Sequence, residues 1–252
     1  MTFATGKHAL ITGGGTGIGA AAARTLAEAG AKLSLLGRRR EPLESIAAET
    51  GGRAITCDVT DPQAQERAFA EAREANGPFD YVILNAGIGD SRPTLKTRRQ
   101  TWDAIIATNL TALFDGAQLA LPDLQQPGKR LVIIASVAGL KGGAMAAPYA
   151  ASKHGAIGLM RSLALEFARS GLTVNAVCPS FVDTPMVDDS AERISRATGR
   201  SVEEARALLA RTNGNGRLIT ADEVAHSILQ LCHPNASGVN GACVTVDGGT
   251  SA

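Results

Sequence analysis

Aromatic residues are scarce in this chain, making up 4% of its 252 residues, with one Trp, two Tyr and six Phe. The core must therefore be built mainly from Ala, Val, Ile and Leu, and each of the two tyrosines stands out. Excess charge is also missing, because 25 basic and 24 acidic residues leave a net charge of +1. This balance provides no general field for nucleic acid or for an anionic membrane, and we expect neither as a partner.

Cysteine pairs and long apolar runs are absent as well. No apolar run reaches the ~18 residues expected of a membrane-spanning helix, and the N-terminal stretch MTFATGKHAL is too short and polar for a signal peptide. The four cysteines form no C-x-x-C pair, which favours small core residues in a reducing compartment: Cys57, Cys178, Cys232 and Cys243. We therefore expect a cytoplasmic protein.

The sequence does contain a regular alternation of short apolar runs and helical patterns. Nearly all-apolar runs are typical of parallel strands buried on both faces. We expect strands at 8–12, 33–37, 54–59, 81–87, 130–136, 172–179 and 242–249. The pattern predicts an α/β fold, a Rossmann-type doubly wound parallel sheet of about seven strands with ligands at their carboxyl ends. No linker or repeat divides residues 1–252, so we expect one domain.

One segment after Pro179 breaks this alternation. Residues 185–215 carry the pattern of two short amphipathic helices, and the Gly/Asn-rich stretch TNGNGR at 212–217 suggests a hinge. A long insertion at the carboxyl end of a strand is typical of a lid or substrate loop. We expect this segment to be mobile without substrate.

The stretch HALITGGGTGIGAAAARTLAEAG combines a strand, a glycine turn and an Ala-rich helix. Gly17, Gly19 and Ala22 fit G-x-G-x-x-A, while Gly13, Gly17 and Gly19 fit a wider spacing. Either spacing lets a pyrophosphate approach backbone amides at the helix N-terminus, although a tight structural turn would also use these glycines. A P-loop is disfavoured because no Lys-Ser/Thr follows the glycines.

The end of the second strand bears on the choice of cofactor. A site for NAD usually carries Asp or Glu there, about 20 residues after the glycines. Here LLGRRRE places Arg38, Arg39 and Arg40 directly after Gly37, and the first acid is Glu41. The carboxylate that would bind the ribose of NAD is missing, and guanidinium groups that suit a 2′-phosphate are present instead. Both observations favour NADP(H) over NAD(H). The alternative is a solvated helix start, although three arginines there oppose the helix dipole.

Asp58, in CDVTD, follows the third strand. Its carboxylate could accept a hydrogen bond from an adenine amino group. It could equally cap the helix expected near Pro62, although Thr60 and Asp61 are better placed for that role.

Tyr149 and Lys153, in APYAASKHG, are one helical turn apart and share a helix face. A tyrosine at a core edge beside a surface lysine is one interpretation. A functional one is that the ammonium lowers the pKa of the phenol and makes it a usable acid/base. Ser136 ends the strand before this helix, and its hydroxyl could bind a substrate carbonyl. Asn109 interrupts an apolar helix stripe, either as a satisfied structural amide or as a holder of water near Lys153.

Together these motifs resemble the classical short-chain dehydrogenases/reductases over essentially the whole chain. TGGGTGIG resembles the family's T-G-x-x-x-G-x-G, and LNAG at 84–87 is similar to its N-N-A-G. Ser136 followed by YAASK matches its Ser and Y-x-x-x-K, and VNAVCPSFVDTPM resembles its N-x-x-x-P-G-x-x-x-T. Two residues depart: Leu84 replaces the first Asn, in a strand expected to be buried, and Ser180 replaces the Gly after Pro179.

The resemblance implies a role for each matching residue. Tyr149 would be the acid/base, Lys153 would lower its pKa and bind the nicotinamide ribose, Ser136 would orient the carbonyl, and Asn109 would support a proton relay. The resemblance also implies which residues would line the rest of the cofactor. The pyrophosphate would be held by Gly13, Thr16, Gly17, Ile18 and Gly19, and the adenine would be lined by Asp58 and Val59. The ribose would be backed by Asn85, Ala86 and Gly87, and the nicotinamide end would be contacted by Pro179, Val182 and Thr184. A homotetramer is also implied, with helices near 98–126 and 149–170 packed across a two-fold axis.

The expected reaction is reversible hydride transfer between a nicotinamide and a secondary alcohol/ketone pair. The candidate substrate pocket, at 89–93, 137–145 and 185–215, is mostly small or apolar. Basic residues around it suit a 3-oxoacyl thioester of coenzyme A or a carrier protein, unless they are merely solvated: Arg92, Lys96, Arg98, Arg99, Arg193, Arg196, Arg200 and Arg206. A hydrophobic or cyclic ketone is the alternative substrate, and a dinucleotide-binding sensor without turnover is the alternative class.

Overall fold

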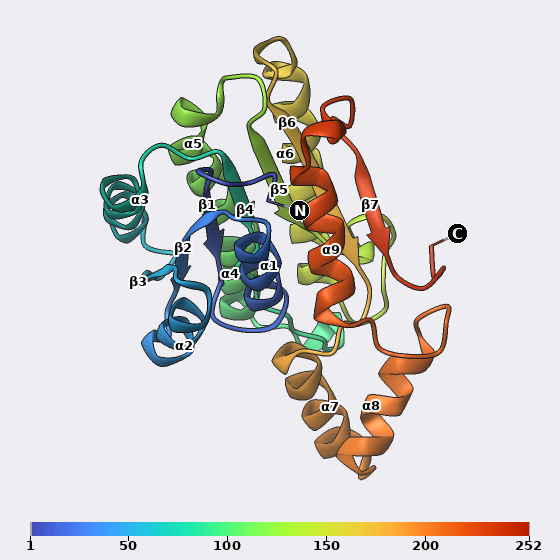
Figure 1. Cartoon of the computed structure of the whole chain (residues 1–252). Helices are drawn as coiled ribbons and strands as arrows, with labels where there is room; N and C mark the ends of the chain where they lie inside the picture. The colour runs from blue at the N-terminus through green and yellow to red at the C-terminus, as the bar shows by residue number, and fades with distance from the viewer. Residues whose placement is uncertain (1, 252) are drawn as a thin grey trace.

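The computed structural model describes residues 2–251. Its strands form one parallel sheet in the order β3-β2-β1-β4-β5-β6-β7 (Figure 1). Their bounds are β1 His8–Thr12, β2 Lys32–Gly37, β3 Arg53–Thr56, β4 Tyr81–Leu84, β5 Arg130–Ile134, β6 Thr173–Pro179 and β7 Cys243–Val246. The order reverses direction at β1 and β4, which creates the crevice at the carboxyl ends where α/β sheets bind ligands. The expected α/β fold is confirmed.

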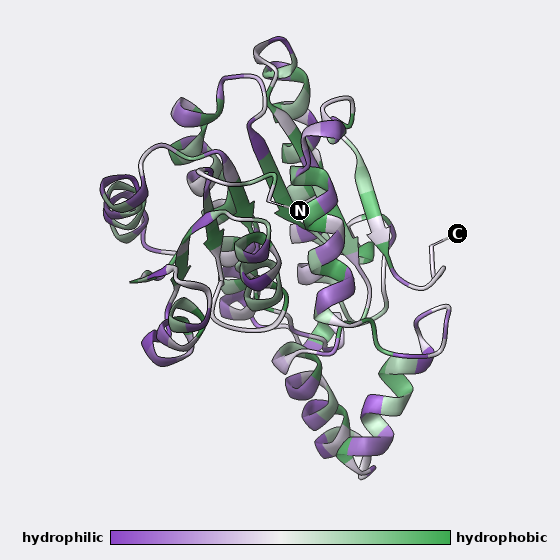
Figure 2. Ribbon diagram, viewed as in Figure 1, coloured by the Kyte–Doolittle hydropathy of each residue, from purple (hydrophilic) through white to green (hydrophobic). Residues whose placement is uncertain are grey.

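Helices cover both faces of the sheet. One face packs α3, α5 and α6, and the other packs α1, α2 and α9, each through an aliphatic cluster. The helices are α1 Gly17–Glu28, α2 Arg40–Thr50, α3 Pro62–Asn76, α4 Arg99–Ile106, α5 Ala112–Leu124, α6 Ala147–Glu166, α7 Pro185–Thr198, α8 Val202–Arg211 and α9 Ala221–Cys232. Figure 2 shows the strands mostly green, as expected of a sheet buried on both faces.

Several strands end earlier than the apolar runs suggested. β4 ends at Leu84 and β5 at Ile134, whereas the runs continue to Gly87 and Ser136. The extra residues lie beyond the strand bounds, although the Ala135 N–H still donates to the Val177 carbonyl of β6 at 2.8 Å. These early strand ends therefore supply the polar groups of the site.

The helices α7 and α8 project from the body of the molecule (Figure 1). They pack on each other through a small apolar cluster that includes Val187, Ala191, Ala205 and Leu209. The two amphipathic helices expected in 185–215 are therefore present. Their cluster is separate from the two clusters that flank the sheet.

The helical stretch Arg99–Leu124 is long and apolar enough to pass a membrane-span test on length and composition. Asp103 and Asp115 interrupt its apolar runs, so none of them reaches ~18 residues. Its α5 segment contacts β4, β5 and α3, as a core helix does, and core helices of soluble proteins pass the same test.

Candidate active site

In the glycine turn after β1, the backbone at Gly19 packs directly against the backbone at Gly13. Gly13 and Gly17 have φ of 68° and 54°, and a Cβ on Gly19 would collide with the Gly13 carbonyl. Thr16, at the N-cap of α1, makes no side-chain cap bond, and the first turn of α1 carries no acid. The N-terminal amides of α1 therefore suit the pyrophosphate of a dinucleotide. Ile18 follows within this first turn.

Asn85 ties the end of β4 to this turn. Its Nδ2 donates to the carbonyl oxygens of Thr12 at 2.9 Å and Gly13 at 3.2 Å. The backbone N–H groups of Asn85 and Ala86 both donate to the Thr12 hydroxyl, at 2.9 and 3.0 Å. Leu84 before them is 4% exposed, as the sequence suggested for this departure from the family. Asn85 thus shapes the wall of the dinucleotide site through backbone contacts.

The three arginines after β2 have different partners. Arg40 forms an ion pair with Glu44 at 2.7 Å, within α2. Arg39 reaches back to the glycine turn and donates to the Thr16 hydroxyl at 3.4 Å. Arg38 is exposed, close enough to Asp58 to help lower the pKa of that carboxyl. Arg38 and Arg39 therefore border the dinucleotide site, whereas Arg40 already has a carboxylate partner.

Asp58 does not cap the helix that follows it. The N–H and hydroxyl of Thr60 donate to its Oδ1 at 3.0 and 2.8 Å, and the first of these bonds is the main cause of its lowered pKa. The cap of α3 is Asp61, which accepts from Gln63 and Ala64. Asp58 is thus a fixed carboxylate at the crevice.

Val59, expected beside the adenine, is 7% exposed and packs in the core cluster of α3, α5 and α6. Little of its side chain is left for a ligand. A contact from this position would have to come from its backbone.

Tyr149 and Ser136 meet as the sequence predicted. The nearby Ser136 hydroxyl lowers the pKa of Tyr149, while burial raises it more strongly. The Ser136 hydroxyl donates to the Pro179 carbonyl at 3.3 Å and accepts from Ala138 N–H at 3.1 Å. The net pKa of Tyr149 is raised. Our expectation that Lys153 would lower it is therefore wrong for this structure, because burial dominates.

Lys153 lies beneath the tyrosine and is 4% exposed. Its Nζ donates to the Ile134 carbonyl at 2.8 Å and lies 5.7 Å from the centroid of the Tyr149 ring. Burial lowers its pKa to about 8. A buried lysine held by a carbonyl, with no ion pair among residues 2–251, is unusual for a purely structural group.

Asn109 occupies a single π-helical turn, Ala107–Thr111, between α4 and α5. Its Oδ1 accepts from Ile88 N–H at 2.8 Å, and its Nδ2 donates to the Ile88 carbonyl at 2.9 Å and the Ser152 hydroxyl at 3.1 Å. A Cβ on Gly87 would lie 3.3 Å from Asn109 Oδ1 and 3.7 Å from Lys153 Nζ. Gly87 therefore lets the amide and the ammonium approach each other, and π turns are frequent at functional sites.

The loop after β6 closes over the glycine turn. Val182 is 5% exposed and pairs with Ile219 in a parallel bridge. Thr184 begins α7, and a Cβ on Gly17 would lie 3.0 Å from its methyl group. The nicotinamide-end residues expected from sequence, Pro179, Val182 and Thr184, thus line the same crevice.

Half of the expected basic rim, four of its eight residues, is already paired with acids. Arg92 pairs with Asp90 at 2.5 Å, and Arg206 pairs with Asp183 at 2.6 Å and with Asp188. Arg99 and Arg196 pair with acids one helical turn away. This arrangement supports the interpretation that the rim is largely solvated charge.

The stretch 212–217, whose composition suggests a hinge, is bonded to neighbouring segments. Asn213 is 2% exposed, accepts from Phe181 N–H at 3.1 Å, and donates to the carbonyls of Phe181 at 2.9 Å and Arg217 at 2.7 Å. Thr250 adds a second link, because its hydroxyl accepts from Gly214 N–H at 2.7 Å. Glycine and asparagine here permit tight packing between segments.

The fold and this constellation define a class, the dinucleotide-dependent oxidoreductases of the doubly wound type. A family model described as "Enoyl-(Acyl carrier protein) reductase" matches residues 13–251. The chain belongs to the short-chain dehydrogenase/reductase family.

Known proteins of this family resemble the chain over nearly its full length. It is 37% identical to levodione reductase of Leifsonia aquatica, over 98% of this chain and 95% of that protein. It is 34% identical to the 3-oxoacyl-acyl-carrier-protein reductase MabA of Mycobacterium tuberculosis (strain CDC 1551 / Oshkosh), over 96% and 92%. The crystal structure of a single-substitution variant of actinorhodin polyketide ketoreductase with NADPH superposes with a TM-score of 0.92 at 35% identity, over 97% of each chain. The protein is an NAD(P)-dependent oxidoreductase of a ketone/alcohol pair.

Several residues of the site carried no usable sequence signal. The Ile134 carbonyl that holds Lys153 and the π turn around Asn109 are backbone features. Ser152, which joins Asn109 to α6, is a serine in a helix like any other. Asn213 lies in the stretch TNGNGR, whose composition alone indicates flexibility.

Proposed function

We propose that the protein is an NADP(H)-preferring ketone reductase that uses Tyr149 as its acid/base. The placement of the Tyr149 phenol beside the Ser136 hydroxyl and a buried ammonium is the observation that carries this proposal. In reduction, Tyr149 donates its proton to the substrate oxygen while Ser136 orients that oxygen. A raised pKa keeps Tyr149 protonated and ready to donate near neutral pH.

Lys153 and Asn109 support the acid/base from below. The Ile134 carbonyl fixes the ammonium, and Asn109 holds the backbone of Ile88 through both its N–H and its carbonyl. Lys153 would bind the ribose next to the nicotinamide, bringing a positive charge toward Tyr149. The pKa of about 8 lets Lys153 exchange a proton at mildly alkaline pH. Asn109 would order a water that connects Lys153 to solvent.

The cofactor site follows the crevice from the glycine turn to α7. The nicotinamide supplies the hydride in reduction and accepts it in oxidation. The open N-terminus of α1 and the close glycine contacts fit a pyrophosphate. Arg38 is the proposed 2′-phosphate ligand, and the position of Arg39 at Thr16 adds a second candidate. The residues that would line this site are Gly13, Thr16, Gly17, Ile18, Gly19, Arg38, Asp58, Val59, Asn85, Ala86, Gly87, Pro179, Val182 and Thr184.

For the substrate we propose a 3-oxoacyl thioester of coenzyme A or of a carrier protein. The similarity to MabA, named a 3-oxoacyl-acyl-carrier-protein reductase, supports this choice. A hydrophobic or cyclic ketone is the second candidate. Levodione reductase supports it, as do the neutralised rim arginines and the exposed apolar side chains of Leu140, Met145 and Met186.

Substitution of Tyr149 by Phe tests the catalytic assignment. The variant keeps the ring and loses the proton, so kcat for ketone reduction is expected to fall by about 10²- to 10⁴-fold while NADPH still binds. Tyr81, the other tyrosine, is buried at the start of β4 and provides a matched control. Tyr81→Phe should keep kcat within about twofold, since it lies at the opposite end of the strands. Near-normal turnover by folded, cofactor-bound Tyr149→Phe would rule out this acid/base.

We also propose a cytoplasmic homotetramer. Four free cysteines, three of them buried, suit a reducing compartment. Apolar side chains on α5 and α6 remain exposed, with Phe114 at 48% and Leu165 at 82%. A second copy of the chain packed on these helices would cover them.

A further inference from the structure

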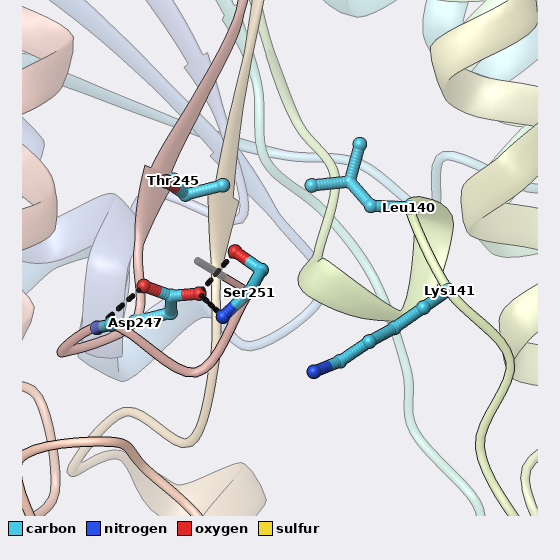
Figure 3. A pocket seen from close by; sticks show the side chains of 6 residues that line it. Leu140, Lys141, Thr245, Asp247 and Ser251 are labelled. Atoms are coloured by element: carbon cyan, nitrogen blue, oxygen red, sulfur yellow. Dashed lines mark hydrogen bonds between the residues drawn. The ribbon is translucent and has the colours of Figure 1, made fainter.

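A cavity of about 500 Å³ lies beside the turn that begins at Ser136 (Figure 3). Its volume is in the range of small-molecule sites in proteins. One wall is formed by residues 140–141, and the other by the carboxyl end of β7 and the turn after it. The lining residues are Leu140, Lys141, Thr245, Asp247, Gly249 and Ser251.

The sheet order places this cavity on the far side of Ser136 from the glycine turn. Ser136 follows β5, the glycine turn follows β1 on one side, and the cavity adjoins β7 on the other. The N–H groups of Leu140 and Lys141 both donate to the Val137 carbonyl, at 3.0 and 3.1 Å. The wall at 140–141 is therefore fixed to the catalytic serine's own turn. A substrate held at Ser136 can extend away from the cofactor into this space.

Asp247 organises the opposite wall and offers little to a ligand. It is 6% exposed and accepts from Gly249 N–H at 3.0 Å, Ser251 N–H at 2.9 Å and the Ser251 hydroxyl at 2.5 Å. These three donors occupy most of the acceptor capacity of the carboxylate. Its remaining effect on a ligand is its negative charge.

Lys141 supplies the hydrogen-bond donors of the cavity. Figure 3 shows its side chain extended, with the nitrogen toward the C-terminal turn, where Nζ donates to the Thr250 carbonyl at 2.8 Å. An ammonium has three N–H groups, so two remain for an acceptor on a ligand. Leu140 adds apolar surface next to it, and Thr245 adds a methyl and a hydroxyl group.

We propose that this cavity is the distal part of the substrate site and that Lys141 binds there a carboxylate carried by the ketone. One ammonium beside the charge of Asp247 suits a monoanion better than a dianionic phosphate. The inference rests on the proposed ketone reduction at Ser136 and Tyr149. It makes Lys141 a specificity-determining residue that selects keto acids over their neutral esters. A ketone with a free carboxylate is thereby favoured over the thioester and the neutral ketone named above.

The experiment compares keto acids with their methyl esters as substrates. A series of methyl ketones from 5-oxohexanoate to 8-oxononanoate, each with its ester, is reduced with NADPH at neutral pH. At one chain length the wild type should favour the acid by about tenfold or more in kcat/KM, the effect of a charge-assisted hydrogen bond. Lys141→Met should abolish this preference and leave the esters unchanged, while Lys141→Arg should retain it. The matched control is Lys32→Met, because Lys32 is an exposed lysine at the amino end of β2. This substitution should change kcat/KM for neither the acids nor the esters.

Two results would overturn the subsite: no acid preference at any chain length, or an equal loss for acid and ester in Lys141→Met. If the wild type reduces no ketone at all, the proposed function fails instead. Calorimetric binding of heptanoate then decides the subsite separately. Weaker binding by Lys141→Met than by wild type supports it, and equal or absent binding rejects it.

Discussion

At the scale of single residues, the site concentrates buried polar groups where the strands β4, β5 and β6 end. Burial raises the pKa of Tyr149 and lowers that of Lys153 to about 8, so burial shifts both groups toward their neutral forms. The hydroxyl of Ser136 counteracts part of the effect on Tyr149. The two proton affinities therefore move apart, because the ordinary pKa values of tyrosine and lysine, 10.0 and 10.5, are nearly equal. The proton is held more firmly by the phenol than by the ammonium. This environment is consistent with proton transfer in the proposed mechanism.

The buried ammonium of Lys153 should leave a signature in the pH dependence of stability. The ordinary pKa of a lysine is 10.5, so between about pH 8 and 10.5 the unfolded chain binds more protons than the folded one. The contribution of Lys153 to the free energy of unfolding therefore rises with pH in this window and is constant below it. In urea unfolding, the free energy of unfolding of wild type minus that of Lys153→Met should increase by roughly 1 kcal/mol between pH 8.5 and 9.5. A difference that stays flat across this range would contradict the lowered pKa.

The three consecutive arginines permit a controlled test of cofactor choice. Arg38→Asp should lower the ratio of kcat/KM for NADPH to that for NADH by roughly 10- to 100-fold, because a charge-assisted bond to the 2′-phosphate is lost. Arg39→Asp should lower it less. Arg40→Asp is the control, since Arg40 already pairs with Glu44 and should leave the ratio nearly unchanged. Equal effects at Arg38 and Arg40 would point to general charge, and a wild type that prefers NADH would refute the assignment.

At the scale of elements, the sequence predicted the strands and the helix of Tyr149 well because these depend on local patterns. Continuous apolar runs, the Ala-rich helix after the glycines and the Pro148 start of α6 are encoded within short windows. Composition misled at 212–217, where glycine and asparagine suggested a hinge. Asn213 instead makes its bonds to Phe181, 32 residues away, a partner that no local pattern reveals.

Asn213 should decide which part of the proposed lid moves. The helices α7 and α8 project from the body and are held together by a small apolar cluster. We expect their backbone amides to exchange hydrogen quickly without substrate and to be protected when cofactor and substrate are bound. Residues 212–217 should exchange slowly in wild type and quickly in Asn213→Ala. Because Asn213→Ala loses the buried hydrogen bonds of the Asn213 side chain, its free energy of unfolding should also be lower than that of wild type by about 2 kcal/mol. Asn235→Ala, at an exposed asparagine, is the control. Rapid exchange of 212–217 in wild type would restore the hinge interpretation.

At the scale of the whole molecule, α4, α5 and α6 have exposed apolar surface beyond what the sheet covers. Gly155 of α6 lies so close to Leu110 that a Cβ would come within 2.7 Å of its side chain. This tight packing makes the helices one continuous surface. The surface is consistent with the proposed assembly across a two-fold axis.

Leu165→Glu tests that assembly. Its side chain is 82% exposed, so the substitution costs the isolated chain little, but a charge in a buried interface is strongly unfavourable. Sedimentation velocity should show tetramers for wild type and smaller species for Leu165→Glu. Leu95→Glu, at a leucine 101% exposed in the short turn Thr94–Lys96, should remain tetrameric. A monomeric wild type would refute the tetramer.

The sequence by itself determined the parallel sheet, the glycine turn, and the shared face of Tyr149 and Lys153, because period and spacing along one element fix these features. Tertiary structure alone decided the direction of the Tyr149 pKa, the pinning of 212–217, and the cavity between Lys141 and the C-terminal turn. Each of these depends on burial or contact between segments far apart in the chain. The bond from Lys141 to Thr250 spans 109 positions, and only folding brings such groups together.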